Sequence, residues 1–333
     1  MDERRRGGSL PQLAGRAMVT DGGMETDLIF HHGVDLPEFA AFVLLTTETG
    51  RSLLTNYYDG YAEVAHAAGA GLVLESPTWR ANPDWGDRLG YGAADLDRVN
   101  REAIALMDSL RARYAPAIDD VVISGMIGPR GDGYRPGSPA DPSAMAAYHL
   151  PQIESFAAAG ADLVTAYTLT DPGEAIGIAT AAREVGIPVG ISFTVETDGR
   201  LPGGMSVEQA VDAVDETCAP DYFLLNCAHP LHVGAGIGGG EGWADRVVGL
   251  RCNASTQSHA ELDESEVLDE GDLTVFVDAH EELRRRFPRL SVLGGCCGTD
   301  RRHVAALWGV GADRQRSTGY TANNSAHRSA ARP

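Results

Sequence analysis

The chain alternates short apolar runs with longer stretches of helical periodicity, and this alternation limits its fold more than any other feature. Each apolar run has the length of a β-strand, and most are followed by an amphipathic stretch of helical length. Consecutive strands joined by helices pair in parallel, because a parallel pair needs a long crossover connection. The runs lie within residues 17–20, 71–75, 121–126, 161–168, 187–195, 221–228, 246–255 and 290–298.

Eight such strands predict an α/β fold, a closed (β/α)8 TIM barrel in a single domain. The runs are apolar nearly throughout, as expected of strands buried on both faces. A doubly wound open sheet is the alternative, but the first turn reads DGGMETD rather than the dinucleotide-binding G-x-G-x-x-G. The helices are predicted at residues 52–68, 95–114, 143–159, 172–185, 206–217, 275–287 and 301–308, and the glycine-rich connector 230–244 is less clearly helical.

Both ends of the chain are polar and lack this periodicity. We expect residues 1–14 to form a flexible N-terminal lead and residues 312–333 a polar C-terminal tail. The predicted barrel then covers residues 15–311.

The chain is strongly acidic, with 27 basic and 47 acidic residues and a net charge of −20. This sign argues against a protein that binds nucleic acid phosphates. No apolar run reaches the roughly 18 residues of a membrane span, and the arginines near the start are not followed by the apolar core of a secretory signal. We therefore expect a cytoplasmic protein whose partners are small molecules. The residues leave the oligomeric state open, and a homo-oligomer is compatible with them.

Three of the five cysteines fall at predicted strand ends. Cys227 ends the sixth strand, and Cys296 and Cys297 end the eighth within the stretch GGCCG. Strand ends of a barrel meet on one face, so we expect these thiols to converge. Three thiolates around an open fourth position make a catalytic type of zinc site, and flanking glycines allow two neighbouring residues to face one ion. The alternatives are ordinary core thiols and a strained disulfide between the adjacent pair.

Four motifs resemble those of the homocysteine S-methyltransferase family. They are DGGMETDL at the first strand, SGMIGPRGDGY in the third unit, LLNC in the sixth and LGGCCGTD in the eighth. The resemblance covers about residues 15–311 and implies a (β/α)8 barrel whose cofactor is Zn2+. The ligands that it implies are Cys227, Cys296 and Cys297.

The resemblance also implies a reaction, the transfer of a methyl group from an onium-type donor to the thiol of homocysteine, which forms methionine. A free thiol has a pKa of about 8.5 and needs the metal to become a thiolate at neutral pH. In the family, the turn after the first strand lies beside the bound amino acid. In this chain that turn consists of Asp21, Gly22, Gly23 and Met24.

The chain departs from the family at the residue that receives the amino group of the substrate. Many members carry a glutamate at the end of the fourth strand, where this chain has Tyr167, which has no carboxylate. We expect Glu75, at the end of the second strand, to supply the missing charge. Thr78 and Asn226, also at strand ends, complete the candidate substrate-binding residues. These departures keep open a different thiol or a selenol as acceptor.

The loop after the second strand, SPTWRANPDW, brings two tryptophans near the predicted rim of the barrel. Trp79 and Trp85 either attract an onium donor by cation–π contact or anchor the loop. Arg80 is either a carboxylate-binding residue or an exposed loop charge. The competing function from another class is a non-catalytic zinc-binding barrel, in which four protein ligands would close the metal site.

Overall fold

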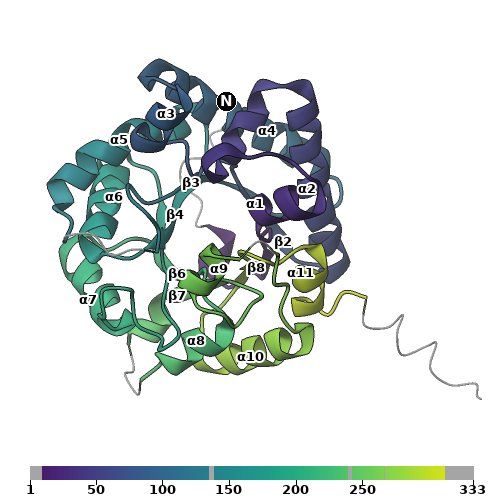
Figure 1. Cartoon of the computed structure of the whole chain (residues 1–333), viewed down its shortest axis with the longest axis vertical. Coiled ribbons are helices and arrows are strands. Elements are labelled where there is room, and N and C mark those ends of the chain that lie inside the picture. Colours follow the sequence, from purple (N-terminus) through teal and green to yellow (C-terminus); the bar gives the residue numbers. More distant parts are fainter. Residues whose placement is uncertain (1–9, 135–138, 239–241, 266, 312–333) are drawn as a thin grey trace, which may run out of the picture.

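The strands close into a ring in which each pairs in parallel with its sequence neighbour and β8 pairs with β1. The computed structural model describes residues 10–134, 139–238, 242–265 and 267–311. Figure 1 looks down the ring, with the strands in the centre and helices around them. The strands are β1 (Met18–Val19), β2 (Gly71–Glu75), β3 (Val121–Ile127), β4 (Leu163–Leu169), β5 (Val189–Phe193), β6 (Tyr222–Asn226), β7 (Val247–Cys252) and β8 (Val292–Gly295). The predicted (β/α)8 barrel is confirmed.

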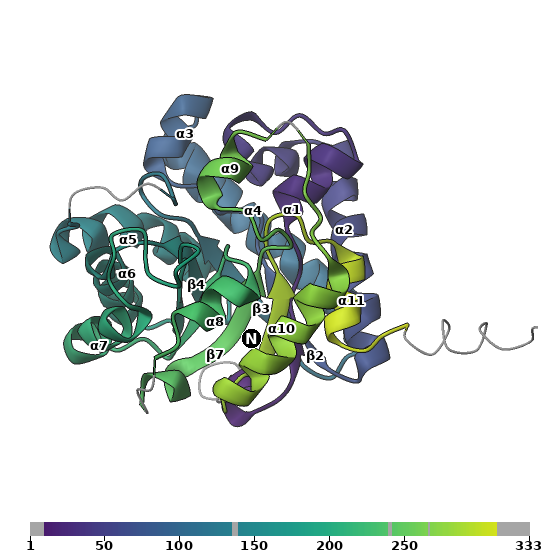
Figure 2. The ribbon, with the colours of Figure 1, turned by 60° about the horizontal axis from the view of Figure 1, so that its bottom comes forward.

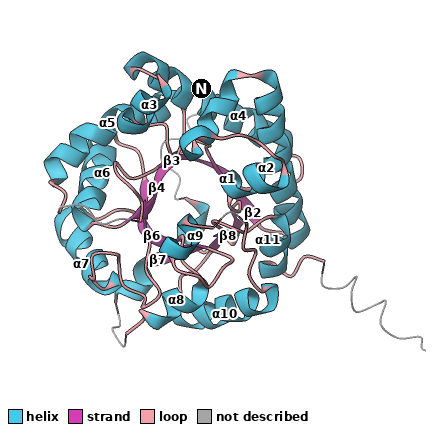
Figure 3. Ribbon diagram, in the orientation of Figure 1, coloured by secondary structure: helices cyan, strands magenta, loops and turns pink. Residues whose placement is uncertain are grey.

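The long helices form the outer layer of the barrel (Figure 3). Local signals fix their ends: Asp171 caps α6 by accepting a hydrogen bond from Gly173 N, and Gly186 ends that helix in the left-handed conformation. The outer helices are α2 (Glu48–Ala68), α4 (Ala93–Tyr114), α5 (Pro142–Ala159), α6 (Pro172–Val185), α7 (Val207–Cys218), α8 (Pro230–Ala235), α10 (Leu273–Arg286) and α11 (Arg301–Leu307).

Two apolar cores hold these layers together. The larger core lies between the strands and the helices, and the smaller one fills the inside of the barrel. The inner core begins with Leu10, which is followed by a short 3-10 helix, Pro11–Ala14. The packed chain therefore starts earlier than the predicted boundary at residue 15, because burying Leu10 fixes this segment. Residues 1–9 of the predicted lead and the predicted tail, 312–333, lie outside the described residues.

Three short helices lie at the end of the barrel where the strands terminate (Figure 2). They are α1 (Met24–Thr26) after β1, α3 (Pro83–Leu89) after β2 and α9 (His259–Asp263) after β7. None of the helices in the described part of the chain is long and apolar enough to cross a membrane. The short helices build the rim on which the predicted site residues lie.

Candidate metal centre

The structure brings together the three cysteines that the sequence singled out. The Sγ atoms of Cys227, Cys296 and Cys297 all lie within 4.8 Å of one another. Cys227 directly follows β6, and the adjacent pair directly follows β8, with β7 between these two strands. Cys227 is buried and the other two are partly exposed. The closeness of three soft donors is the arrangement that a thiolate-bound metal ion requires.

The backbone at Cys227 is strained in a way that serves this arrangement. Its φ of 53° is left-handed, which is uncommon for a residue other than glycine. Surrounding groups hold its carbonyl oxygen: Asn253 Nδ2 donates to it at 3.0 Å, and His259 Nε2 also contacts it. Such strain persists only where neighbours fix the conformation, and here it places the Cys227 thiol beside the pair from β8.

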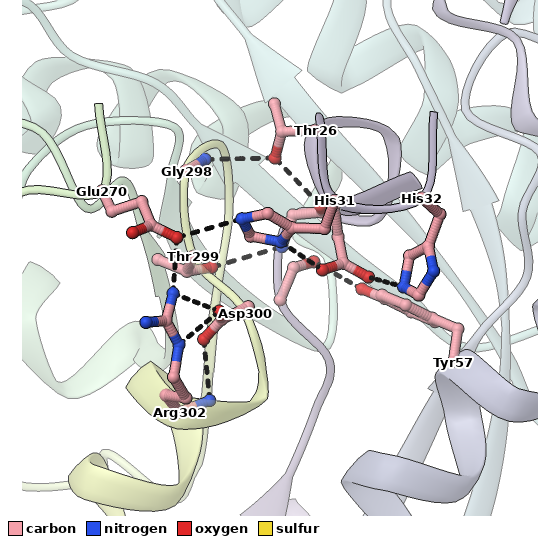
Figure 4. Close-up of polar contacts among 12 residues, drawn as sticks. Thr26, His31, His32, Tyr57, Glu270, Gly298, Thr299, Asp300 and Arg302 are labelled. Atoms are coloured by element: carbon pink, nitrogen blue, oxygen red, sulfur yellow. Dashed lines mark hydrogen bonds and ion pairs between the residues drawn. The ribbon is translucent and has the colours of Figure 1, made fainter. Parts of the chain in front are cut away.

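The turn that carries the cysteine pair packs directly against the segment after β1. Gly298 has a φ of 76°, and its N–H donates to Thr26 Oγ1 at 3.1 Å (Figure 4). A Cβ atom on Gly23 would lie 2.5 Å from the carbonyl oxygen of Cys296. The two glycines therefore allow a close approach that other residues would block.

A network of charged residues also fixes the turn after β8 that carries the cysteine pair. Asp300 caps α11 by accepting a hydrogen bond from Arg302 N at 2.7 Å, and the Arg302 guanidinium contacts both Asp300 and Glu270 (Figure 4). His31 bridges Glu270 at 3.0 Å and Asp27 at 2.9 Å. The segments after β1, after β7 and after β8 are thereby tied together around the cysteine pair.

Hydroxyl groups donate hydrogen bonds to the thiol cluster. Tyr134 OH lies 3.4 Å from Cys227 Sγ and 3.9 Å from Cys297 Sγ, and Thr168 Oγ1 lies 3.6 Å from Cys227 Sγ. Hydrogen bonds from Cys296 and Cys297 hold the pKa of Cys227 well below its usual range, and the neighbouring Cys227 raises the pKa of Cys296 to about 12. One thiolate thus discourages the ionisation of its neighbours, and a divalent cation would remove this conflict. The donor set fits a soft metal ion such as zinc.

A buried ion pair lies below the cysteine pair. Arg251, in β7, contacts Asp21 Oδ1 at 2.8 Å and donates to the carbonyl oxygens of Gly22 and Gly295 at 3.0 Å each. Tyr57 OH donates to Asp21 Oδ2 at 3.1 Å. Burial raises the pKa of Asp21, with the charge of Arg251 opposing this effect. The carboxylate expected beside the substrate already has a cation as its partner.

Glu75, which is expected to supply the carboxylate that Tyr167 lacks, is in direct contact with Tyr167. Tyr167 OH donates to Glu75 Oε1 at 2.8 Å, while Glu75 Oε2 is buried and has no hydrogen-bond partner among the described residues. The Arg251 guanidinium lies 4.9 Å from the Tyr167 ring centroid. Burial raises the pKa of Glu75 to about 7, and Arg251 opposes this increase. The glutamate therefore has one oxygen ready to accept a hydrogen bond.

The other predicted substrate residues make contacts within the rim or are buried. Asn226 Oδ1 accepts from Thr168 N at 2.9 Å, and Asn226 Nδ2 lies 4.0 Å from Cys296 Sγ. The hydroxyl of Thr78 donates to the carbonyl oxygen of Met126 at 2.8 Å, which ties the loop after β2 to β3. Gly22 and Met24 are buried.

Four residues of the site were not anticipated from the sequence: Arg251, Tyr57, Thr168 and Tyr134. A signal for Arg251 was present, because an arginine within the apolar stretch VVGLRC must find a buried partner. Thr168 has a φ of 64° beside a register irregularity between β4 and β5, which residue types alone do not reveal.

Comparisons with known proteins identify the family and agree with the fold. The homocysteine S-methyltransferase family model matches residues 18–309. The fold is similar to the metallated form of the homocysteine methyltransferase MmuM from Escherichia coli, with 21% sequence identity, a TM-score of 0.68, and coverage of 88% of this chain and 96% of that one. The oxidized form of MmuM matches with 20% identity, the same TM-score, and 88% and 95% coverage. No curated protein matches in a sequence search. Because the family model matches nearly its full length, the chain belongs to the homocysteine S-methyltransferase family.

Proposed function

We propose that this protein transfers a methyl group to the thiol sulfur of homocysteine and that Cys227, Cys296 and Cys297 bind Zn2+ for this reaction. The observation that carries the proposal is the meeting of three cysteine Sγ atoms within 4.8 Å at the catalytic end of a barrel of this family. Thiols persist in a reducing compartment, which supports a cytoplasmic location.

The metal and the surrounding residues have separate tasks. A bound zinc ion supplies the positive charge that lets a thiol lose its proton at neutral pH. Tyr134 and Thr168 donate hydrogen bonds to Cys227 and stabilise its negative charge. Asn226 joins Thr168 to this shell, because its amide donates to Thr168 Oγ1 at 2.9 Å. These residues keep the ligand sulfurs oriented before the substrate arrives.

The amino group of the acceptor is best placed at Glu75. Glu75 Oε2 is a buried acceptor with no partner in the described part of the chain, and an ammonium group would satisfy it. Tyr167 orients the carboxylate through its hydrogen bond to Oε1. In this proposal Tyr167 and Glu75 together replace the glutamate that the family usually has in β4.

Methyl transfer balances without a further reactant. The acceptor sulfur forms a bond to the methyl carbon, and the bond from that carbon to the positive atom of the donor breaks. The electron pair of the broken bond stays on the donor, which leaves neutral, while the thiol proton passes to solvent. Holding both reactants in line supplies much of the rate.

A second candidate is the same reaction on another acceptor, and the ion pair between Arg251 and Asp21 favours it. This pair neutralises one carboxylate beside the substrate turn, and Tyr167 has none to offer. An acceptor thiol or selenol without an α-amino group would then bind with little loss of affinity relative to homocysteine. Comparing kcat/KM for homocysteine and for 4-mercaptobutyrate, which lacks only the amino group, separates the two candidates.

The test combines metal analysis with acceptor binding. Protein prepared without chelator should contain about one zinc per chain, and adding homocysteine should add one sulfur neighbour in the zinc X-ray absorption spectrum. Methyl transfer is then measured with sulfonium and betaine donors. A zinc spectrum that does not change with any thiol would contradict the proposal and indicate a structural metal site.

A further inference from the structure

Arg80 is enclosed between two aromatic rings at the rim of the barrel. Its guanidinium carbon lies 3.9 Å from the ring centroid of Trp79 and 3.6 Å from that of Trp85. Only 9% of the residue is exposed, so it is no exposed loop charge. A planar guanidinium stacked between two indoles has little freedom to rotate, which fixes the directions of its N–H groups.

The contacts of the two tryptophans argue against the expectation that their ring faces bind an onium donor. Trp85 has a second guanidinium on its ring, that of Arg88 at 4.5 Å. Trp79 is held in place, because its Nε1–H donates to the carbonyl oxygen of Tyr167 at 3.5 Å. Since Arg80 already contacts both rings, the pair anchors an arginine instead of forming an empty aromatic cage.

The enclosed guanidinium has donors that the protein does not use. Arg80 Nε and Nη1 are buried, and neither has a hydrogen-bond partner in the described part of the chain. Burial lowers the pKa of Arg80 to about 10, so the group remains charged at neutral pH. A buried cation with unused donors is costly, and a carboxylate oxygen that accepts a hydrogen bond from Nε–H or from Nη1–H would offset part of that cost.

The position of Arg80 connects it to the candidate metal centre. Trp79, which stacks on its guanidinium, donates a hydrogen bond to the carbonyl oxygen of Tyr167, whose hydroxyl in turn donates to Glu75. The carboxyl groups whose charge acts on Arg80 are those of Glu25, Asp132 and Glu38. This acidic setting disfavours a dianion such as phosphate and suits a monoanion that carries its own positive charge.

We propose that Arg80 binds the carboxylate of an amino-acid substrate at the rim of the active site. The proposal deepens the proposed function and rests on it for the identity of the ligand. Two sources share this chemistry, the α-carboxylate of the thiol acceptor and the carboxylate of a zwitterionic onium donor. Trp79 and Trp85 act by positioning the guanidinium.

The first experiment observes the Arg80 side chain directly. The Nε–H signal of Arg80 is followed by NMR in 15N-labelled, zinc-loaded protein and is identified by its absence in Arg80→Gln. Homocysteine and S-methylmethionine are the carboxylated probes, and 3-aminopropane-1-thiol and (3-aminopropyl)dimethylsulfonium are their decarboxylated counterparts. We expect a downfield shift with one carboxylated probe and none with its counterpart, and the responding pair identifies acceptor or donor.

The second experiment measures affinity for the same probes. The wild type should prefer the carboxylated member of the responding pair by about 10- to 100-fold, and Arg80→Gln should reduce this preference to about onefold. Arg88→Gln is the matched control, because it removes the other guanidinium on Trp85 and should keep the preference.

The outcomes separate this proposal from the proposed function. A carboxylate-dependent shift without any methyl transfer supports the Arg80 subsite and rejects the methyltransferase activity. Methyl transfer without a shift for any probe, or a preference that survives in Arg80→Gln, overturns the subsite and leaves the activity in place. If Arg80→Gln folds poorly, Arg80→Lys, which also lacks the Nε–H group, identifies the signal, and the wild-type titration then decides the matter.

Discussion

Glu75 provides a quantitative test of how burial affects the charged residues of the candidate site. Replacing Glu75 by Gln keeps an oxygen that can accept the hydrogen bond from Tyr167 OH but removes the ionisable group. Burial raises the pKa of Glu75 from 4.5 to about 7, so the folded protein binds a proton more tightly there than the unfolded chain does. Stability must therefore fall as the pH rises from about 4.5 to about 7.

The size of the effect follows from the shift in pKa. A change from 4.5 to about 7 corresponds to about 3 kcal/mol, at about 1.4 kcal/mol for each tenfold change in proton affinity. Below pH 4.5 both states are protonated at this residue, and the wild type and Glu75→Gln should differ little. At pH 8 the variant should be more stable than the wild type by up to about 3 kcal/mol. The same variant should raise the KM for the acceptor.

The assay is urea unfolding of both proteins at several values between pH 4.5 and pH 8, with equal zinc content. Glu208→Gln, on the exposed first turn of α7, is the matched control and should show no comparable dependence on pH. If the stability difference between the wild type and Glu75→Gln is the same at both ends of this range, the argument that burial raises this pKa is wrong.

Three further changes test the metal centre and its support. Cys227→Ser should reduce the zinc content from about one per chain to near zero, as measured by metal analysis of reduced protein. Gly23→Ala places a Cβ atom 2.5 Å from the Cys296 carbonyl oxygen, and it should destabilise the protein by about 1–3 kcal/mol in thermal unfolding and weaken zinc binding in a chelator competition. Arg251→Met leaves Asp21 buried without its cation and should cost about 3–5 kcal/mol in urea unfolding. The double variant with Asp21→Asn should recover part of that loss, and no recovery would mean that the pair is not coupled.

The fold was predictable because its signals are local and repeated. Helix α6 was predicted at residues 172–185 and is found there, since Asp171 and Gly186 mark its two ends. The connector after β6 carried weaker signals, and its described residues form the short helix α8 and a 3-10 helix, Trp243–Arg246. Leu10 was missed because one apolar residue in a polar segment does not reveal that it enters the barrel.

The candidate site was only partly predictable. The three cysteines were identified because glycines flank two of them and all three fall at strand ends. The contacts of Arg251 with Asp21 and of Tyr167 with Glu75 join residues far apart in the chain, so they depend on the closed ring of strands. The sequence left Arg80 either as a carboxylate-binding residue or as an exposed loop charge. Its stacking between Trp79 and Trp85 depends on the orientation of these two side chains, which the sequence does not reveal.

The placement of the cysteines on both sides of β7 has a consequence for biosynthesis. A growing polypeptide that has left the ribosome only as far as the turn after β6 offers one of the three thiols, and the other two emerge only after β8. If these thiols bind a metal ion as proposed, tight binding must wait until the barrel can close. Truncated products that lack β8 would then hold the ion weakly, so metal retention would report that the barrel has closed.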